Sequence, residues 1–257
     1  MSAVIVIPAR FASSRYPGKP LAILKGRDGE KTLIQRTWET GQSVQGVSRV
    51  VVATDDTRIA DHARGFGAEV VMTSEACRNG TERVAEAAQA MDVSPEIIIN
   101  LQGDAPLTPS WFMEDLISAM RTRPEIGVAT PVLLTDAEAY ARFREDRTQG
   151  RVGATTAVMR TDGVALYFSK ELLPFLPDPT VAEPPVYHHV GIYAYRPSAL
   201  ERYVNWPQGP LETLEGLEQL RFLEQGEPVL CVEVDARGRQ FWELNNPVDV
   251  ARIESVL

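Results

Sequence analysis

Several features that are common in other protein classes are scarce in this sequence. It has only two cysteines, Cys77 and Cys231, with no CxxC motif and no cysteine–histidine spacing typical of a metal site. Two cysteines are too few for a disulfide framework, so we expect both as reduced thiols. Cations are outnumbered, with 26 Lys and Arg against 35 Asp and Glu, and the formal net charge is −9. An acidic surface argues against nucleic acid or an anionic membrane as the main partner.

Long apolar runs and the best-known nucleotide motifs are missing as well. The N-terminal apolar stretch, AVIVI, has no basic segment before it and runs directly into Pro8. It is too short to cross a membrane and lacks the layout of a signal peptide, so we expect a cytoplasmic protein without membrane insertion. The sequence contains neither GxGxxG nor GxxxxGK[ST]. Their absence disfavours a dinucleotide-binding oxidoreductase and a P-loop NTPase.

What the first half does contain is a regular alternation of strand and helix patterns. Runs rich in Val and Ile predict strands at 3–8, 49–54, 68–73, 96–102 and 127–132. Apolar residues at spacings of three and four predict helices at 32–44, 56–67, 81–91 and 108–122. Several strands are apolar on both faces, which is typical of a parallel sheet covered by helices on both sides. The fold class is therefore α/β.

The second half is mixed. Patterns predict strands at 154–160, 164–169, 187–196 and 229–234, and helices at 197–204, 212–226 and 247–256. The segment 134–153 is polar and charged, and the proline-rich 176–185 reads as a loop. We therefore divide the chain into 1–133, 134–228 and a C-terminal strand and helix at 229–257 that returns to the main domain. A single integrated domain is the alternative.

The stretch PARFASSRYPGKPL, residues 8–21, places three cations directly after a buried strand. Loops at the carboxyl ends of strands in an open α/β sheet are where ligands bind. Arg10, Arg15 and Lys19 suit a polyanion, most simply a triphosphate, because guanidinium and ammonium groups pair with phosphate oxygens. Gly18 lets the backbone approach the ligand closely. The alternative is a solvated basic loop, which the acidic background of the chain disfavours.

Two further motifs follow strands. Asp104 ends the run IIINLQGD, where a carboxylate beside a phosphate site is a natural Mg²⁺ ligand; the alternative is an aspartate that caps a turn after Gly103. The run NGTER, 79–83, opens a helix. Gly80 and Thr81 can present backbone donors to a base, or Thr81 can simply cap the helix, and both can hold together.

These motifs together carry a resemblance to a known family. PARFASSRYPGKPL resembles the signature of CMP-Kdo synthetases (3-deoxy-manno-octulosonate cytidylyltransferases), which is usually close to PARxxSxRxPGKPL. The likeness continues, in the family's order and over nearly the whole chain, as VATDD (52–56), GTERVAEA (80–87), NLQGDAPL (100–107), ALYFSK (165–170), HHVGIYAYR (188–196) and LETLEGLEQLRFLEQG (211–226). It implies a Rossmann-like nucleotidyltransferase fold, mostly parallel, with a smaller mixed α/β lobe at 134–228 for acceptor binding and dimerisation.

The resemblance also implies an activity and a set of site residues. The reaction is transfer of CMP from CTP to an anionic acceptor, with release of pyrophosphate and with Mg²⁺ as cofactor. The implied catalytic cations are Arg10, Arg15 and Lys19, and the CTP contacts are Pro8, Ala9, Arg10, Gly80, Thr81, Arg83 and Gln102. The implied acceptor contacts are Gln102, Lys170, His189, Tyr193, Glu218 and Gln219, and the metal ligand is Asp104. From the residues alone, Glu218 and Gln219 lie in a helix whose Leu214, Leu217 and Leu220 form a core stripe.

Three positions depart from the family pattern. QGDEP becomes QGDAP with Ala105, ALYFSR becomes ALYFSK with Lys170, and Asn245 stands where the VDTPEDL-like segment has a second metal-binding aspartate. Lysine does not reproduce the bidentate contact of arginine, and the neutral asparagine is a poorer ligand for Mg²⁺. Kdo (3-deoxy-manno-octulosonate) is the first choice of acceptor, and a small phosphonate such as phosphonoformate is the alternative. A non-catalytic nucleotide-binding module is the alternative from another class, and the apolar pattern at 187–226 is compatible with a homodimer.

Overall fold

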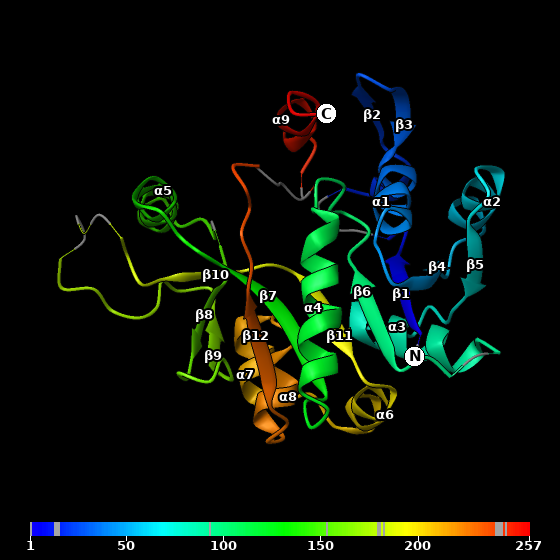
Figure 1. Ribbon diagram of the computed structural model, residues 1–257. Coiled ribbons are helices and arrows are strands. Elements are labelled where there is room, and N and C mark those ends of the chain that lie inside the picture. Colours follow the sequence, from blue (N-terminus) through cyan, green and yellow to red (C-terminus); the bar gives the residue numbers. More distant parts are fainter. Residues whose placement is uncertain are drawn as a thin grey trace.

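The structure is a computed structural model that describes residues 2–12, 16–92, 94–152, 154–178, 181, 183–239, 244 and 246–257 (Figure 1). Its strands are β1 (Ala3–Ala9), β2 (Ile23–Gly26), β3 (Gly29–Thr32), β4 (Val47–Thr54), β5 (Glu69–Met72), β6 (Ile97–Leu101), β7 (Val128–Leu134), β8 (Thr156–Met159), β9 (Ala165–Ser169), β10 (Tyr187–His189), β11 (Ile192–Tyr195) and β12 (Val229–Glu233). Its helices are α1 (Leu33–Gln42), α2 (Thr57–Gly65), α3 (Gly80–Ala90), α4 (Ser110–Thr122), α5 (Ala137–Thr148), α6 (Pro197–Asn205), α7 (Pro210–Glu215), α8 (Leu220–Glu224) and α9 (Asp249–Glu254), with a short 3₁₀ turn η1 at Lys19–Leu21.

One large sheet runs through the molecule in the order β5-β4-β1-β6-β11-β7-β10-β8-β9, and β12 pairs with β7. Strands β5, β4, β1 and β6 are parallel, as expected for strands linked by crossover helices. Their carboxyl ends therefore lie at the same edge of the sheet. This edge carries the loop after β1 and the turn after β6, which places two of the predicted site motifs side by side.

The rest of the sheet is mixed. Strand β11 is antiparallel to both β6 and β7, and β10 is antiparallel to β7 and β8. The predicted single strand 187–196 is wrong in this respect, because the chain leaves strand geometry at Val190 and Gly191 and forms two strands. Both strands pair with β7, and together they connect β6 to β8.

Side chains alternate between two hydrophobic cores, one on each face of the sheet. In β1, Ile5 and Ile7 face the core shared with α1, α2 and α4, whereas Val4 and Val6 face the core shared with α3, α6 and α8. Figure 1 shows α4 in front of the sheet and α3 behind it. Helices on both faces explain why β1 is apolar along its whole length.

One predicted segment differs from the structure, and one hairpin of the structure was not predicted. The predicted polar boundary at 134–153 contains a helix, α5, which begins at the N-cap Asp136 and buries only Tyr140 and Phe143. Two buried side chains leave too weak a periodic pattern to be read from sequence. The short hairpin β2–β3 was not predicted either; Arg36, on α1, holds it by donating to the carbonyl oxygens of Leu24 and Gly29.

The predicted helix 212–226 is in fact two short helices. Helix α7 ends at Gly216, which has φ +61, and α8 begins at Leu220. A left-handed glycine is a common helix terminator. Leu214, expected in the core stripe, is 83% exposed. Glu218 and Gln219 consequently lie in the turn between α7 and α8, and not within a helix.

The C-terminal segment returns to the first part of the chain. Strand β12 runs parallel to β7, and α9 lies beside the β2–β3 hairpin (Figure 1). Between them, the Leu244 N–H donates to the backbone oxygen of Asp104 at 2.9 Å. Within the described residues, we find no helix whose length and apolar character would let it cross a membrane.

Candidate active site

The loop after β1 is built around a glycine and an aromatic ring. Pro8 and Ala9 are buried at the end of β1, and Arg10 is exposed directly after it. Gly18 has φ +71 and donates its N–H to the Phe11 oxygen at 2.9 Å. A Cβ at Gly18 would lie 3.0 Å from the Phe11 ring, so both the backbone conformation and the space require glycine here. The turn directs the chain back so that Lys19 faces the sheet edge. Arg15 lies outside the described residues.

Lys19 meets the predicted metal ligand. Its Nζ lies 2.6 Å from Asp104 Oδ2, and both side chains are largely buried. The turn before Asp104 passes so close to β1 that a Cβ at Gly103 would lie 2.8 Å from the Pro8 oxygen. The two motifs that the sequence predicted at this edge are therefore in direct contact, and the side chain of Asp104 forms an ion pair instead of capping a turn.

The residues at this point are compatible with Mg²⁺ bound together with a phosphate ligand. No group of three or more His, Cys, Asp or Glu side chains suited to a metal is found among the described residues. Mg²⁺ in nucleotide sites takes one or two carboxylates and completes its shell with phosphate oxygens and water. Asp104 can supply one such carboxylate. Its carboxylate already pairs with a cation, the ammonium of Lys19. Asn245 lies outside the described residues.

The N-terminus of α3 lies beside the turn after β6. The N-cap is Asn79, whose Oδ1 accepts from the Glu82 N–H at 2.9 Å, so the capping role predicted for Thr81 belongs to Asn79. A Cβ at Gly80 would come within 2.8 Å of Gln102 Nε2. The absence of a side chain at Gly80 thus lets Gln102 rest against the start of the helix.

Glu218 and Gln219, which were predicted as acceptor contacts, lie on the α7–α8 turn and contact the N-terminus of α3 and strand β11. The Thr81 N–H donates to Glu218 Oε2 at 3.0 Å, and Gln102 Nε2 lies 3.5 Å from Glu218 Oε1. Tyr193 donates its hydroxyl to Gln219 Oε1 at 3.1 Å. Five of the predicted site residues therefore form one polar cluster, joined to Lys19 and Asp104 through the turn Gln102–Gly103–Asp104.

Burial shifts the pKa of Glu218, in this cluster, and of His189, whose ring lies beside Tyr193. Burial raises the pKa of Glu218, and the Thr81 N–H that it accepts acts in the opposite direction. Burial, together with the neighbouring His188, lowers the pKa of His189 to about 3. His189 is therefore neutral near pH 7; its Nε2 is hydrogen-bonded to the Thr130 hydroxyl at 2.9 Å, and its ring lies 5.6 Å from that of Tyr193.

Two predicted residues are placed differently from the rest. The Arg83 guanidinium is buried and pairs with Asp55 at 2.7 Å and with the Thr73 hydroxyl, so it ties α3 to the ends of β4 and β5. The Lys170 N–H donates to Glu215 at 2.9 Å, and its ammonium lies against Gly216. Arg83 has a structural partner on each side, and its contact with CTP stays a prediction.

Sequence reasoning did not identify the residues that support the cluster. The Tyr195 hydroxyl is 2.8 Å from the Thr81 hydroxyl, and the Tyr203 hydroxyl lies between Asn79 and the turn that carries Glu218. In the sequence these tyrosines read as ordinary core positions of a strand and a helix. Their tyrosine identity could have indicated a supporting role, since a buried hydroxyl needs a hydrogen-bond partner.

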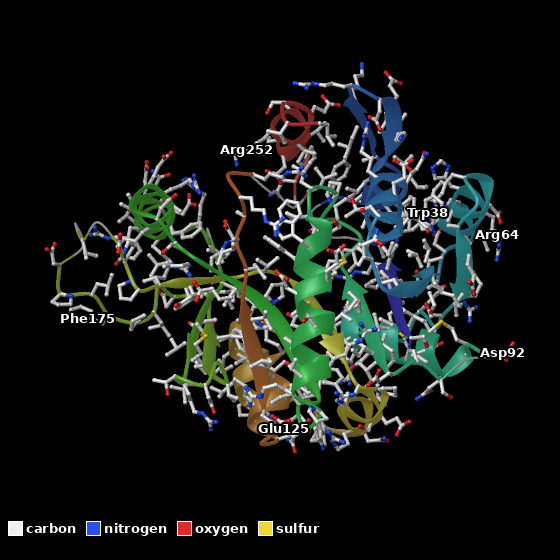
Figure 2. All side chains as sticks on the ribbon, viewed as in Figure 1. Trp38, Arg64, Asp92, Glu125, Phe175 and Arg252 are labelled. Carbon is white, nitrogen blue, oxygen red and sulfur yellow. The ribbon has the colours of Figure 1, made fainter. Side chains whose placement is uncertain are left out.

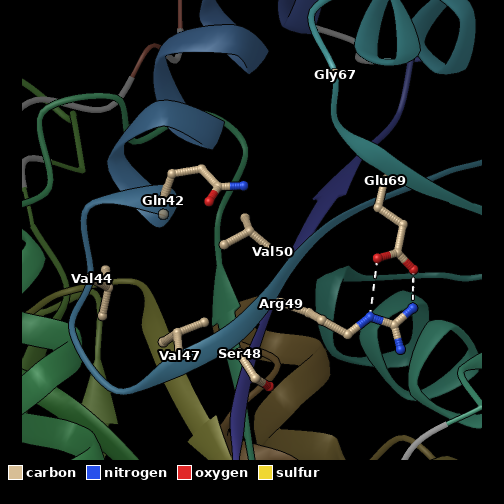
Figure 3. Close-up of a pocket in the computed structure, with 9 residues that line it drawn as sticks. Gln42, Val44, Val47, Ser48, Arg49, Val50, Gly67 and Glu69 are labelled. Atoms are coloured by element: carbon tan, nitrogen blue, oxygen red, sulfur yellow. Dashed lines mark hydrogen bonds and ion pairs between the residues drawn. The ribbon is translucent and has the colours of Figure 1, made fainter.

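A separate pocket lies elsewhere on the molecule (Figure 3). It is lined by residues near the end of α1 and the start of β4 and β5, among them Gln42 and an Arg49–Glu69 ion pair. These residues lie at the opposite end of β4 from Thr54, where the strand reaches the polar cluster's edge of the sheet. The pocket therefore contributes nothing to the candidate site.

Comparisons with known proteins agree with this geometry. A family model described as cytidylyltransferase matches residues 4–229. The chain belongs to the cytidylyltransferase family. The 3-deoxy-manno-octulosonate cytidylyltransferase of Maricaulis maris (strain MCS10) is 43% identical over 257 residues, which are 100% of this chain and 97% of the relative. The enzyme of the same name from Chlamydia pneumoniae is 42% identical over 253 residues, or 98% of this chain and 92% of the relative.

A solved structure shows that the likeness extends to the fold. CMP:2-keto-3-deoxy-manno-octonic acid synthetase complexed with CTP superposes with a TM-score of 0.85 at 34% identity, covering 99% of this chain and 98% of the other. The family resemblance and the mostly parallel α/β fold predicted from sequence are confirmed, as is the enzyme class. This cytidylyltransferase is a nucleotidyltransferase.

Proposed function

We propose that this cytidylyltransferase transfers CMP from CTP to 3-deoxy-manno-octulosonate and releases pyrophosphate. The observation that carries the proposal is the adjacency of two groups of side chains. The cation Lys19 and the carboxylate Asp104 lie on one side of the Gln102–Gly103–Asp104 turn, and the polar cluster with Glu218 lies on the other. The names of the full-length relatives support the sugar acid over phosphonoformate as the acceptor.

On the nucleotide side, the protein supplies charge and position. Nucleotidyl transfer needs neutralisation of phosphate charge and in-line geometry more than covalent help. Lys19, with Arg10 and Arg15 from the same loop, holds the triphosphate and stabilises the departing pyrophosphate. Asp104 would hold Mg²⁺, which when bound supplies further positive charge against the phosphate oxygens. Gly80 and Thr81, at the N-terminus of α3, would lie against the base, with the Thr81 N–H held by Glu218.

On the acceptor side, the cluster offers directional hydrogen bonds. Gln219 Nε2 is buried and has no hydrogen-bond partner among the described residues, so it is a free donor within the cluster. Because His189 is neutral, it takes part through hydrogen bonding and ring packing and does not add a positive charge. Lys170 is then the predicted acceptor contact that carries a positive charge, which suits an acceptor with one carboxylate.

A homodimer and a cytoplasmic location remain part of the proposal. The lobe exposes large apolar side chains, with Leu134 48%, Leu166 59% and Phe175 84% accessible. Figure 2 shows Phe175 at the far side of the lobe, away from α4 and α9. Exposed apolar side chains of this size are typical of an interaction surface. Analytical ultracentrifugation of the purified protein tests the dimer, and a single monomeric species would refute it.

Product analysis tests the proposed reaction directly. The full-length protein is incubated with CTP and Mg²⁺ and, in parallel reactions, with 3-deoxy-manno-octulosonate, with phosphonoformate or with no acceptor. We expect pyrophosphate release and a CMP-linked product with the sugar acid only, and loss of both on adding EDTA. A product with phosphonoformate alone would overturn the choice of acceptor, and full activity in EDTA would overturn the role of the metal.

A further inference from the structure

Tyr203, on α6, is buried behind the polar cluster and touches both of its halves. Its side chain is fully inaccessible to solvent. The hydroxyl accepts from Asn79 Nδ2 at 2.9 Å and donates to the backbone oxygen of Glu218 at 3.2 Å. One hydroxyl thus connects the N-cap of α3, on the nucleotide side, with the α7–α8 turn, on the acceptor side.

We propose that Tyr203 is a positioning residue that holds the α7–α8 turn, and with it Glu218 and Gln219, at the distance from α3 that acceptor binding requires. This inference rests on the proposed function for the identity of the acceptor. Tyr203 itself cannot touch a substrate, because its ring and hydroxyl are enclosed by α3, α6 and α8.

The contacts of Glu218 show why the turn depends on this hydroxyl. Its carboxylate is held by the Thr81 N–H, and its backbone oxygen by Tyr203. The same backbone oxygen accepts the Arg221 N–H at 3.3 Å, but that bond lies within the turn and the start of α8. Among the described residues, the Tyr203 hydroxyl therefore makes the hydrogen bond that ties the backbone of this turn to another element.

A buried ionic network keeps the Tyr203 ring in place. The Arg221 guanidinium lies 4.1 Å from the ring centroid, with the geometry of a cation–π contact. The guanidinium also makes a bidentate pair with Glu212, at 2.7 Å for both bonds, and a 3.1 Å bond with Glu82. Glu212 lies on α7, Arg221 on α8 and Glu82 on α3, so the network holds the helices on either side of the turn against α3.

Loss of the hydroxyl should affect the nucleotide side, at α3, less than the acceptor side, at the α7–α8 turn. Asn79 keeps its own bond to the Glu82 N–H, so α3 retains its cap. The turn keeps the bond from the Thr81 N–H to the Glu218 carboxylate, but the backbone oxygen of Glu218 loses its bond to α6. A variant lacking the hydroxyl should therefore impair use of the acceptor more than binding of CTP.

Tyr203→Phe tests this with a minimal change, since it removes one oxygen and keeps the ring that packs on Arg221. Tyr187→Phe is the matched control: it also removes one hydroxyl, which donates to Glu233 at 3.3 Å on the lobe. Removal of Arg221 would leave the buried carboxylate of Glu212 without its ion pair and take one of two cationic partners from Glu82, which threatens folding, so it is not used. Steady-state kinetics at saturating Mg²⁺, well below the melting temperatures, give KM for each substrate and kcat.

For Tyr203→Phe we expect kcat/KM for 3-deoxy-manno-octulosonate to fall about tenfold, with KM for CTP changed by less than about twofold. Tyr187→Phe should match the wild type. Hydrogen–deuterium exchange of the protein without substrates should show faster exchange in peptides covering 216–222 in Tyr203→Phe alone.

A lower melting temperature with unchanged kinetics and unchanged exchange would reduce Tyr203 to a structural residue and overturn the inference. Equal losses for CTP and the acceptor would also overturn it. If the wild-type protein makes no CMP-linked product, the proposed function fails separately. The exchange measurement then still decides whether the hydroxyl holds the turn, and unchanged exchange refutes the inference.

Discussion

At the scale of single residues, Lys19 and Asp104 form the ion pair at the centre of the candidate site. The Lys19 ammonium pairs with Asp104 at 2.6 Å, in the place where a metal would neutralise the same carboxylate. A triphosphate would offer the Lys19 ammonium several anionic oxygens, whereas Asp104 offers it one carboxylate. Arrival of nucleotide and metal together can therefore release Lys19 to the phosphates while Asp104 keeps a cationic partner.

Replacement of Lys19 should remove activity without unfolding the protein. We expect Lys19→Ala to lower kcat by about 100-fold or more, because one preorganised charge on the departing pyrophosphate is lost. Lys25→Ala is the control, since that side chain is 72% exposed and, among the described residues, pairs only with Glu30. Pyrophosphate release measures both variants, and near-wild-type turnover of Lys19→Ala would remove Lys19 from the mechanism.

The Lys19–Asp104 ion pair should also affect the affinity of the site for a divalent metal ion. In the absence of nucleotide, Lys19→Ala should bind Mn²⁺, used in place of Mg²⁺, several-fold more tightly than the wild type. The reason is that the ammonium no longer competes for Asp104. Asp104→Asn should bind Mn²⁺ more weakly than either. Electron paramagnetic resonance of free Mn²⁺ gives the affinities, and equal affinity of all three proteins would contradict the role of Asp104.

At the scale of elements, the break between α7 and α8 positions the residues of the proposed acceptor side. Gly216 ends α7 with φ +61, and a Cβ there would lie 3.1 Å from Lys170 Nζ. A continuous helix over 212–226 would carry Glu218 and Gln219 on its surface at helical spacing. The break instead turns both side chains toward α3 and β11.

Gly216→Ala should therefore destabilise the protein and impair the turn. A left-handed conformation costs a residue with a Cβ about 1–2 kcal/mol, so we expect a loss of that size in the free energy of unfolding. The control is Gly65→Ala at the end of α2, where a Cβ meets no atom within 4 Å and φ is not positive. Urea denaturation measures both, and equal stability of the two variants would show that the backbone at Gly216 is not strained by a side chain.

At the scale of the whole molecule, the sheet buries titratable groups that its folding must keep uncharged. Burial lowers the pKa of His189 to about 3, and burial with the nearby Arg142 lowers that of His188 to about 4. Both values lie below the 6.5 of a histidine in an unfolded chain. The unfolded protein thus binds more protons than the folded one below pH 6.5, and stability is lost as the pH falls through that range.

The free energy of unfolding should decrease by about 1.4 kcal/mol per pH unit for each such histidine between pH 6.5 and about 4. Glu218, whose pKa is raised by burial, acts in the opposite direction, because the folded protein then holds its proton above the 4.5 of an unfolded glutamate. A comparison of the wild type with His189→Gln isolates one histidine. We expect urea denaturation from pH 7.5 to 5 to give a shallower slope for the variant; identical slopes would mean that His189 is not buried in the neutral form.

The sequence alone was sufficient for the parts of this protein that depend on local pattern. Continuous apolar runs in 3–8 and 96–102 predicted buried parallel strands, because two covered faces leave no polar positions. The rule that ligands bind at carboxyl ends of strands then placed Lys19 and Asp104 together before any distance was known. The family resemblance added the predicted acceptor residues, of which periodicity alone assigned Glu218 and Gln219 to a core helix.

Only the tertiary structure could decide what depends on contacts between distant segments. Local pattern gives no sign that Arg83 is satisfied by Asp55, since the partner lies 28 positions away. Nor does it show that Gly216 breaks a helix, because the leucine spacing continues across it. The hydroxyl of Tyr203 meets Asn79 across 124 positions. Apolar periodicity reports which face of an element is buried, whereas the partner of a buried polar atom is set by which elements the fold brings together.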